Sequence, residues 1–454
     1  MSNAPAVKLA IERLVFGGEG LARLGDGTAG QAQSAAPEAI LAGADAAPAS
    51  PETAPAGRGK AVFVPLVLPG EIVEAQLEED HRSYAHARLL RVLRPAAARQ
   101  SPPCPYFGEC GGCQWQQIVP AAQLEYKQAI LAETLGRLAG LRELPPIELH
   151  RSPPWQYRNR ARWRMLASTP RLGYRRWHSR VALGVSQCRL LHPALERLTQ
   201  LDWPAPPREI EELEAAVNEA GELQLHWLAR DASEDLAAWC KAAAELAGAR
   251  AAAVTSGAET RALGGGDAAL TLTVNRIAYR LSPGAFFQVN RFLLPELATA
   301  MAADTGGERA LDLYSGVGLF ALPLLDGFGW VSAVEAEATA ASDLRWNARH
   351  AQGAGDGRLH VSAMTAEEFI ERSSGQSFDL AIVDPPRAGL GKRVLAGLLR
   401  LQPRRLHYLS CDPATLARDL KPLCAAGYQI EQLHLFDLFP QTYHLETLVR
   451  LRRD

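Results

Sequence analysis

The sequence lacks long apolar runs and an excess of charge of either sign. Its 454 residues contain no stretch of roughly 18 or more apolar side chains, and the opening MSNAPAVKLAIERL has no apolar segment of the signal-peptide kind. We therefore expect no membrane span and no export, which predicts a cytoplasmic location. Basic residues number 48 and acidic residues 50, so a nucleic-acid partner can be predicted only from local charge.

Cysteine is also scarce. Seven cysteines in a chain of this length are too few for a disulfide scaffold. Three of them, Cys104, Cys110 and Cys113, lie close together in CPYFGECGGC, and Cys188 in VSQCRLLHP is the best candidate for a fourth metal ligand. The spacing is of the ferredoxin type, in which a distant cysteine completes an iron-sulfur cluster. A structural zinc site can use the same four thiolates, and spacing alone does not separate the two.

The N-terminal part is predicted to be β-structure. With 47% hydrophobic residues the chain can form substantial cores, and its length predicts two to four domains. Short alternating runs at 7–24 and 60–94 predict one small β-barrel. Residues 27–59 between them are too poor in large apolar side chains to offset the entropy of ordering, which predicts a mobile insertion in the barrel.

The central part combines a predicted helix at 121–138 with an arginine-rich stretch. Residues 151–180 hold nine arginines and no acidic residue, interleaved with tryptophan and tyrosine. Guanidinium groups pair with phosphates and aromatic faces stack on bases, so this mixture suits single-stranded or looped RNA; a solvated charged face is the alternative. Alternation places Arg158, Arg160, Arg162 and Arg164 on one face of a strand. Further on, 207–247 is acidic and helix-prone, with one strand-like run at 223–228.

The C-terminal part alternates strands and helices from Leu281 onward, which predicts a parallel doubly wound α/β sheet. The predicted strands are 310–314, 330–336, 359–362, 378–383 and 406–410. Two final runs, at 428–436 and 445–451, predict a hairpin and hence an antiparallel edge, typical of one class of methyltransferase sheets. We therefore expect three domains: a barrel over 1–95, a central domain over 96–270 and a C-terminal domain over 271–454.

A glycine-rich turn follows the first strand of that sheet. In LDLYSGVG, Tyr314, Gly316 and Gly318 precede a predicted helix whose N-terminus points into the same crevice, and Glu335 ends the next strand, placed to bind ribose hydroxyls. A tight turn is the alternative reading of the glycines. The third glycine of the dinucleotide fingerprint and the G-x-x-x-x-G-K-S/T motif are both absent, so S-adenosylmethionine is favoured over NAD and ATP.

Four more residues are predicted to face the crevice at the strand ends. Cys411, in YLSCDPATL, follows a strand and precedes a helix beginning near Pro413, whose positive end is expected to lower the thiol pKa. Asp384 in IVDPPRAG and Gln288 in SPGAFFQVN aim at the same crevice, and Asp384 could accept a hydrogen bond from a ring N–H. Glu446 in FPQTYHLETL lies on the final hairpin, where a solvated glutamate is the alternative.

Taken together, these motifs resemble the RNA uracil-C5 methyltransferases that carry an N-terminal TRAM barrel and an iron-sulfur cluster. The resemblance spans nearly the whole chain and is greatest to the bacterial branch acting on 23S ribosomal RNA. It implies an OB-like TRAM barrel, a central α+β iron-sulfur and RNA-binding domain, and a Rossmann-like class I methyltransferase domain. The motifs, in the family's order, are VLPGE, CPYFGECGGC, QCRLL, FFQVN, LDLYSGVG, VDPPRAG, YLSCDPATLARDL and FPQTYHLETL.

The resemblance also implies roles for single residues. Cys411 is the nucleophile and Glu446 the base. The cofactor S-adenosylmethionine is contacted by Gln288, Tyr314, Gly316, Gly318, Glu335 and Asp384. RNA is contacted by Phe286, Arg158, Arg160 and Arg162, and a [4Fe–4S] cluster is held by Cys104, Cys110, Cys113 and Cys188. The chain departs from the pattern at Leu319 and Asp412, where relatives often have Asn, and at Thr365, near a position commonly Asp or Asn.

The chemistry of uracil supports these roles independently. C5 is too poor a nucleophile to take a methyl group directly, so a thiolate must first add to C6. The adduct then carries an extra proton at C5, which a general base removes. Because C5 and C6 are buried in folded RNA, the base must be unstacked into the pocket, where Phe286 could stack on it.

Other functions stay open at this point. The same reaction on a transfer-RNA uridine is one alternative, and an RNA-binding scaffold without activity is another, although both Cys411 and Glu446 are present. A radical enzyme is disfavoured because its C-x3-C-x2-C spacing is absent. The sequence indicates no obligate protein partner and does not specify the uridine.

Overall fold

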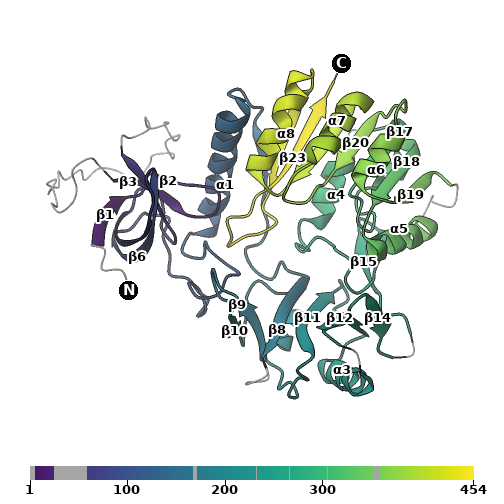
Figure 1. Cartoon of the computed structure of the whole chain (residues 1–454), viewed down its shortest axis with the longest axis horizontal. Helices are drawn as coiled ribbons and strands as arrows, with labels where there is room; N and C mark the ends of the chain where they lie inside the picture. Colours follow the sequence, from purple (N-terminus) through teal and green to yellow (C-terminus); the bar gives the residue numbers. More distant parts are fainter. Residues whose placement is uncertain are drawn as a thin grey trace. The chain divides into compact units, whose positions relative to one another are not determined.

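The computed structural model describes residues 6–24, 59–166, 171–231, 233–264, 266–303, 305–351 and 357–453. The chain forms two compact units. The first comprises Met1–Ser101 with Gln117–Val119, and the second comprises Pro102–Gln116 with Pro120–Asp454. Figure 1 shows the first unit in purple and dark blue, and the second from blue through yellow. The predicted division into three domains, with boundaries after residues 95 and 270, stays a prediction.

The first unit is the predicted β-barrel domain. Alternating burial along its strands directs one set of small apolar side chains inward, among them Val62, Val64 and Val73. Its six-stranded sheet has the order β1-β5-β6-β4-β3-β2, in which only the β4–β6 pair is parallel. The strands are β1 (Ala6–Ala10), β2 (Arg13–Leu14), β3 (Gly20–Leu24), β4 (Lys60–Val64), β5 (Ile72–Asp80) and β6 (Tyr84–Arg94). The predicted insertion at 27–59 lies outside the described residues, Gly59 excepted.

The second unit contains the predicted doubly wound sheet. Its order is β19-β18-β17-β20-β21-β23-β22-β7, parallel from β19 to β21, with β23 antiparallel to both of its neighbours. Helices cover both faces, as Figure 1 shows for the green and yellow part of the chain. Its strands are β17 (Gly307–Leu313), β18 (Phe328–Glu335), β19 (Leu359–Ala363), β20 (Leu380–Val383), β21 (Arg405–Ser410), β22 (Gln429–Phe436), β23 (Glu446–Arg452) and β7 (Ile147–His150).

The helices of this unit follow local sequence signals. Asp412 caps α8, where its carboxylate accepts from the backbone N–H groups of Ala414 and Thr415, and Pro413 opens the helix as predicted. Thr365 and Glu368 form a capping box on α6. The helices are α1 (Pro120–Thr134), continued by the π-helical turn η1 (Leu135–Ala139), α2 (Pro193–Leu198), α3 (Glu234–Ala247), α4 (Leu294–Ala302), η2 (Pro323–Asp326), α5 (Ala338–His350), α6 (Ala366–Arg372), α7 (Gly391–Leu401) and α8 (Pro413–Ala425).

Two smaller sheets complete the second unit. One has seven strands in the order β10-β9-β8-β11-β12-β13-β14, and the other is the hairpin β15-β16. Their strands are β8 (Arg160–Leu166), β9 (Arg171–Arg175), β10 (Ala182–Gly184), β11 (Ile210–Val217), β12 (Leu223–Ala229), β13 (Ala251–Ser256), β14 (Glu259–Ala262), β15 (Leu270–Val274) and β16 (Ile277–Leu281).

Two features of the fold differ from the sequence-based expectation. Residues 210–217 form β11 rather than helix, because cross-strand pairing with β8 and β12 overrides the helix propensity of Glu and Ala. The final hairpin is not the edge of the large sheet, because β7, from the central part of the chain, adds in parallel to β22. In the described residues, no helix is long and apolar enough to cross a membrane.

Candidate active site

A pocket of about 720 Å³ opens at the carboxyl ends of β17, β18, β20 and β21. This volume is within the range of roughly 300–1,000 Å³ that small-molecule sites occupy, and strand carboxyl ends are where ligands of such sheets bind. The sequence-predicted residues that line the pocket are Arg158, Phe286, Gln288, Tyr314, Gly316, Glu335, Asp384, Cys411 and Glu446. Folding therefore brings together residues that lie as much as 288 positions apart, from 158 to 446.

The glycine-rich turn after β17 has the conformation that its sequence predicts. Tyr314, Gly316 and Gly318 all have positive φ, of 66°, 55° and 99°. Gly316 donates its N–H to the carboxylate of Glu335 at 2.8 Å, so the turn and the end of β18 are tied together. Gly318 does not line the pocket; a Cβ there would lie 2.7 Å from Leu344 of α5. Its role is to let the turn pack against that helix.

Cys411 and Glu446 become neighbours through the antiparallel pairing of β21 with β23. In this ladder Ser410 is opposite Thr447, and continuing the register by one residue places Cys411 opposite Glu446. Residues opposite one another in such a ladder have Cα atoms roughly 4.5–5.5 Å apart. Glu446 is 3% exposed, so the solvated-strand alternative is wrong for this side chain.

The electrostatics of the thiol differ from the sequence-based expectation. The helix N-terminus was expected to lower the pKa of Cys411, but burial and the nearby carboxyl groups of Glu446 and Asp384 raise it to about 11. Burial raises the pKa of Asp384 to about 7. Burial and the charge of Asp384 raise the pKa of Glu446 well above its ordinary value. Three acidic groups in one buried pocket thus disfavour one another's ionised forms.

Arg387 supplies the opposing charge, and the sequence analysis did not single it out. It follows Asp384 in the D-P-P-R turn after β20 and lines the pocket. Its positive charge lowers the pKa values of both Cys411 and Glu446, against the larger effect of burial. Its place in VDPPRAG, three residues after the predicted Asp384, is the sequence signal that pointed to it. His444 also lines the pocket, and burial together with Arg387 lowers its pKa to about 4.

The segment before Glu446 is held by hydrogen bonds from the central part of the chain. The N–H groups of Gln114 and Trp115 both donate to the carbonyl of Gln441, at 3.1 and 3.0 Å. The Tyr157 hydroxyl donates to the carbonyl of Pro440 at 3.1 Å. Gln441 has a φ of 68°, a left-handed conformation that these contacts stabilise. The position of Glu446 therefore depends on residues more than 280 positions earlier in the sequence.

Phe286 and Gln288 come from the segment between β16 and α4. Phe286 is 65% exposed, which leaves its ring free to stack on a base. Nearby Asn290 is fully buried and donates to the carbonyl of Leu438 at 3.0 Å, so the FFQVN segment is fixed against the loop that leads to Glu446. The sequence analysis quoted this motif without recognising the structural role of its asparagine.

The predicted alternation is found for Arg160, Arg162 and Arg164, whereas Arg158 precedes β8 and is not part of that strand; the acidic partners that 151–180 lacks come from β11. Arg160 and Arg162 point to one face of β8 and alternate with the buried Ala161 and Trp163, which point to the other. Pairing with β11 brings Glu214 within 3.0 Å of Arg160 and Glu212 into an ion pair with Arg162. Neither of these two arginines lines the pocket, whereas Arg158 does.

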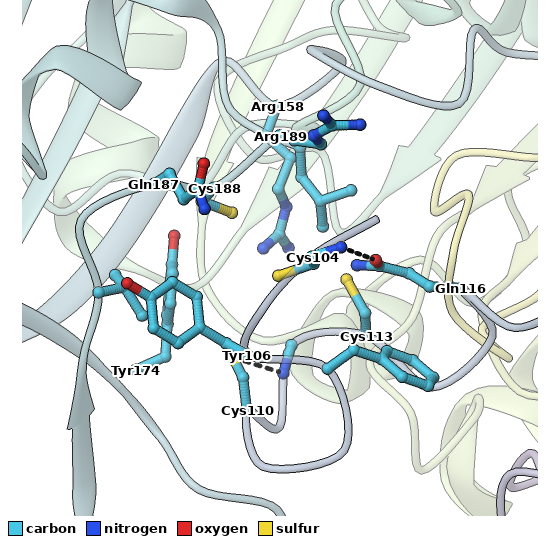
Figure 2. A pocket seen from close by; sticks show the side chains of 14 residues that line it. Cys104, Tyr106, Cys110, Cys113, Gln116, Arg158, Tyr174, Gln187, Cys188 and Arg189 are labelled. Atoms are coloured by element: carbon cyan, nitrogen blue, oxygen red, sulfur yellow. Dashed lines mark hydrogen bonds between the residues drawn. The ribbon is translucent and has the colours of Figure 1, made fainter. Parts of the chain in front are cut away.

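A second cavity gathers the predicted metal ligands, because Cys104, Cys110, Cys113 and Cys188 all line it. Figure 2 shows the sulfur atoms of Cys104, Cys113 and Cys188 pointing into the space between them. Burial and, to a smaller extent, the neighbouring thiols raise the pKa values of Cys110 and Cys113. Burial raises the pKa of Cys188 to about 11. The thiols of Cys110, Cys113 and Cys188 are therefore costly to ionise without a cation beside them.

The two cavities are neighbours, since Gly112 and Arg158 line both. The CPYFGECGGC loop thus forms one wall of the pocket that contains Cys411 and Glu446. Asp312, in the LDLYSGVG motif, is another residue that the sequence analysis passed over. It is fully buried near the end of β17, and burial raises its pKa well above its ordinary value.

Known proteins share both units. The family model of the TRAM domain matches residues 7–90, and that of tRNA (Uracil-5-)-methyltransferase matches residues 267–454. An uncharacterized RNA methyltransferase of Aquifex aeolicus is 30% identical over 99% of both chains. The 23S rRNA (uracil(1939)-C(5))-methyltransferase RlmD of Pectobacterium atrosepticum is 33% identical, over 87% of this chain and 90% of that one.

A solved structure has the same fold. It is the Pyrococcus abyssi tRNA (uracil-54, C5)-methyltransferase in complex with S-adenosyl-L-homocysteine, with 23% identity, a TM-score of 0.65, and coverage of 87% of this chain and 96% of that one. The predicted fold class, a Rossmann-like methyltransferase domain with an N-terminal TRAM barrel, is thereby confirmed. This chain belongs to the family of RNA (uracil-C5) methyltransferases, enzymes that depend on S-adenosylmethionine.

Proposed function

We propose that the protein methylates C5 of one uridine in 23S ribosomal RNA, by way of a covalent bond between Cys411 and C6 of the base. The observation that carries this proposal is the pairing of β21 with β23, which places a cysteine and a buried glutamate side by side in the pocket that also holds Gly316 and Glu335. A thiol and a carboxyl group are the two groups that addition to C6 and proton removal from C5 require.

In the proposed reaction, the thiolate of Cys411 adds to C6 and the electron pair of the C5–C6 bond becomes available at C5. S-adenosylmethionine, when bound, supplies the electrophilic methyl group that C5 takes up. Glu446 then removes the C5 proton, and the C6–S bond breaks to return the thiolate. Because burial and Asp384 raise the pKa of Glu446, its carboxylate is a stronger base than an exposed glutamate. Arg387 favours the ionised forms of both groups.

The cofactor would lie beside the glycine-rich turn. Gly316 allows the backbone to approach a ligand closely, and Tyr314 and Glu335 line the same pocket. Each oxygen of Glu335 already accepts one backbone N–H, from Gly316 at 2.8 Å and from Glu337 at 2.7 Å. A carboxylate oxygen has two acceptor sites, so Glu335 retains capacity for the ribose hydroxyls. Gln288 and Asp384 line the rest of the pocket.

Ribosomal RNA is the proposed substrate because the relatives with that name are 32% to 33% identical over most of this chain. Transfer RNA is the second candidate, since the structural neighbour acts on a transfer-RNA uracil and the matching family model is named for transfer RNA. Arg158 and the exposed Phe286 are the pocket residues suited to phosphate and base contact. Mapping 5-methyluridine in both RNA classes from a deletion strain separates the two: loss from 23S ribosomal RNA alone is expected, and loss from transfer RNA alone would refute the proposal.

Glu446→Gln tests the mechanism. Glutamine keeps the size and hydrogen bonding of the side chain but not its basicity, so the methylated adduct should form and fail to resolve. Incubation with substrate RNA and S-adenosylmethionine should give a slow protein-RNA band on a denaturing gel. Adding Cys411→Ala to the same variant is the matched control and should abolish the band. Normal turnover of Glu446→Gln without the band would mean that another group is the base.

We also propose that the four cysteines hold a [4Fe–4S] cluster. The donor set fits, because four thiols line one largely buried cavity and thiolates are the ligands that such clusters take. Anaerobically purified protein should be brown and contain about four irons per chain, and Cys188→Ser should lower the iron content. Stoichiometric zinc without iron would establish the alternative metal. The cluster would stabilise the loop whose Gln114 and Trp115 amides position Gln441.

A further inference from the structure

A group of histidine and glutamate side chains lies at the other edge of the large sheet, away from the pocket and the cysteines. Register pairs His434 of β22 with Glu148 of β7, and His150 follows two residues later on the same face. The two histidines are buried, whereas the Glu148 side chain is 66% exposed. Three donor atoms, one from each of these residues, lie within 4.8 Å of one another.

In each imidazole, the ring nitrogen that faces away from the other histidine, called the outer nitrogen here, already lies near a hydrogen-bond acceptor. His150 Nδ1 lies 2.7 Å from the Glu296 carboxylate of α4, and His434 Nε2 lies 3.4 Å from Gln432 Oε1. That atom of Gln432 accepts from Arg450, which only donates, so it is the amide oxygen. These contacts assign the protons of the neutral rings to the outer nitrogens. The lone pairs are left on His150 Nε2 and His434 Nδ1.

Those two inner nitrogens face each other at 3.0 Å. A carboxylate oxygen of Glu148 lies 3.4 Å from His434 Nδ1, and the other lies 3.8 Å from His150 Nε2. Two ring nitrogens and both oxygens of the Glu148 carboxylate thus converge, and in these tautomers none of the four atoms carries a proton. Such an arrangement of lone pairs suits a cation, either a proton or a metal ion, at its centre.

We propose that Glu148, His150 and His434 form a binding site for a divalent transition-metal cation of the Zn²⁺ class. Zinc binds histidine nitrogen and carboxylate oxygen at about 2.0–2.2 Å, so two ligands at a tetrahedral angle are separated by about 3.3 Å. The two nitrogens are 3.0 Å apart, and they lie 3.4 and 3.8 Å from different oxygens of Glu148, close to this value for a carboxylate that can bind through either oxygen. Two histidines with one carboxylate also match the donors of known three-ligand zinc sites, whose fourth position is filled by water.

The residues around the three ligands support the same assignment. The Glu296 carboxylate accepts a hydrogen bond from the outer nitrogen of His150. A carboxylate in this position orients the histidine in known metal sites. Phe436 stacks on the His150 ring, with centroids 3.9 Å apart and planes 7° from parallel, which fixes the direction of its Nε2 lone pair. Glu148 and Glu296 together carry the two negative charges that balance Zn²⁺. The guanidinium of Arg450 contacts Gln432 on the outer side of the His434 ring.

The consequence of such a site is structural. Glu148 and His150 belong to β7 and His434 to β22, and only four residue pairs join these two strands. A metal ion would therefore link the edge strand from the central part of the chain to the methyltransferase sheet. Residues 151–158, which lead from β7 to Arg158 in the pocket, begin at this link. Zinc at this site should stabilise the fold without taking part in methyl transfer.

The test uses the full chain, purified without oxygen so that the cysteine site keeps its own metal. Equilibrium dialysis against Zn²⁺ should show one zinc ion bound per unaltered chain. The Glu148→Gln variant should bind this ion with at least tenfold lower affinity. Glu148 is exposed, so this variant should fold. Glu296→Ala should weaken binding about 10- to 100-fold, as loss of a residue that orients a ligand does. Glu431→Gln, on β22 but outside the site, is the control and should bind zinc as the unaltered chain does.

Thermal unfolding gives a second readout. Added Zn²⁺ should raise the melting temperature of the unaltered chain and of Glu431→Gln, because a ligand that binds only the folded state stabilises it. It should leave that of Glu148→Gln unchanged. If no zinc binds, a proton bridges the two histidines and the proposal is wrong. If zinc binds equally to all the variants, it occupies another site, and the proposal is equally wrong.

Discussion

The buried ion pair between Lys127 and Asp437 provides the sharpest test of how the loop between β22 and β23, which leads to Glu446, is held. Lys127 of α1 is 0% exposed, and its ammonium donates to the carboxylate of Asp437 at 2.7 Å and to the carbonyl of Phe439 at 3.0 Å. Burial lowers the pKa of Lys127, and the charge of Asp437 opposes that effect. Asp437→Asn removes the counter-charge while keeping the side chain's shape, so it leaves a buried cation without an opposite charge.

The cost of this change can be bounded. Breaking a buried pair by removing one partner typically costs about 3–5 kcal/mol. The lysine can escape the penalty by losing its proton, and at pH 7 that costs about 4.6 kcal/mol, from an ordinary pKa of about 10.4 and about 1.36 kcal/mol per unit. We therefore expect Asp437→Asn to lower the free energy of unfolding by about 3–5 kcal/mol at pH 7.

The pH dependence of this loss follows from the same balance. In the variant the folded-state pKa of Lys127 is depressed below its unfolded value, so the unfolded state binds more protons and stability rises with pH. At pH 9 deprotonation costs only about 1.9 kcal/mol. The difference between variant and unaltered chain should therefore be smaller at pH 9 than at pH 7, and it should shrink by up to about 1.4 kcal/mol per pH unit.

Urea denaturation followed by circular dichroism at pH 7, 8 and 9 measures this difference. The double variant Lys127→Met with Asp437→Asn is the matched control. It has neither charge of the pair, so no unpaired charge is buried, and it should recover most of the lost stability at pH 7. A loss below about 1 kcal/mol that does not change with pH would refute the reasoning. It would mean that Lys127 is already neutral in the folded protein.

Three further predictions concern the pocket and the glycine-rich turn beside it. Cys411→Ala should abolish methyl transfer but leave binding of S-adenosylmethionine intact in calorimetry, and turnover near the normal rate would refute the assignment of the nucleophile. Asp384→Asn should lower the pKa of Cys411 and Arg387→Gln should raise it, because the first removes a charge that opposes the thiolate and the second a charge that favours it. The pH profile of iodoacetamide alkylation should shift to lower pH in the first variant and to higher pH in the second, and opposite shifts would contradict the electrostatic account. Gly318→Ala should lower the free energy of unfolding by about 1–3 kcal/mol, because Gly318 has a φ of 99° and an added Cβ would clash with Leu344. The same variant should bind S-adenosylmethionine more weakly. Unchanged stability and affinity would mean that the turn tolerates a Cβ.

Local sequence was sufficient for much of the fold. The strand-helix alternation after Leu281, the helix start at Pro413 and the glycine-rich turn were predicted from patterns that act over a few residues. Their physical basis is local, because propensity, capping and positive φ depend on immediate neighbours. The order of the sequence motifs along the chain also indicated the enzyme family without any knowledge of the geometry. The same reasoning selected Cys411, Glu446, Asp384 and Gln288 as candidates that share one pocket.

Only the tertiary structure decided what depends on distant partners. Residues 210–217 form a strand because β8 and β12 pair with them. Glu446 is buried beside Cys411 because of the register of β23 on β21. Burial of the thiol, together with this nearby carboxyl group, raises the pKa that the helix N-terminus alone would lower. Likewise β7 adds to the edge of the large sheet and brings Glu148 next to His434. Register, burial and charge proximity are sums over contacts between residues far apart in the chain, and no local pattern contains them.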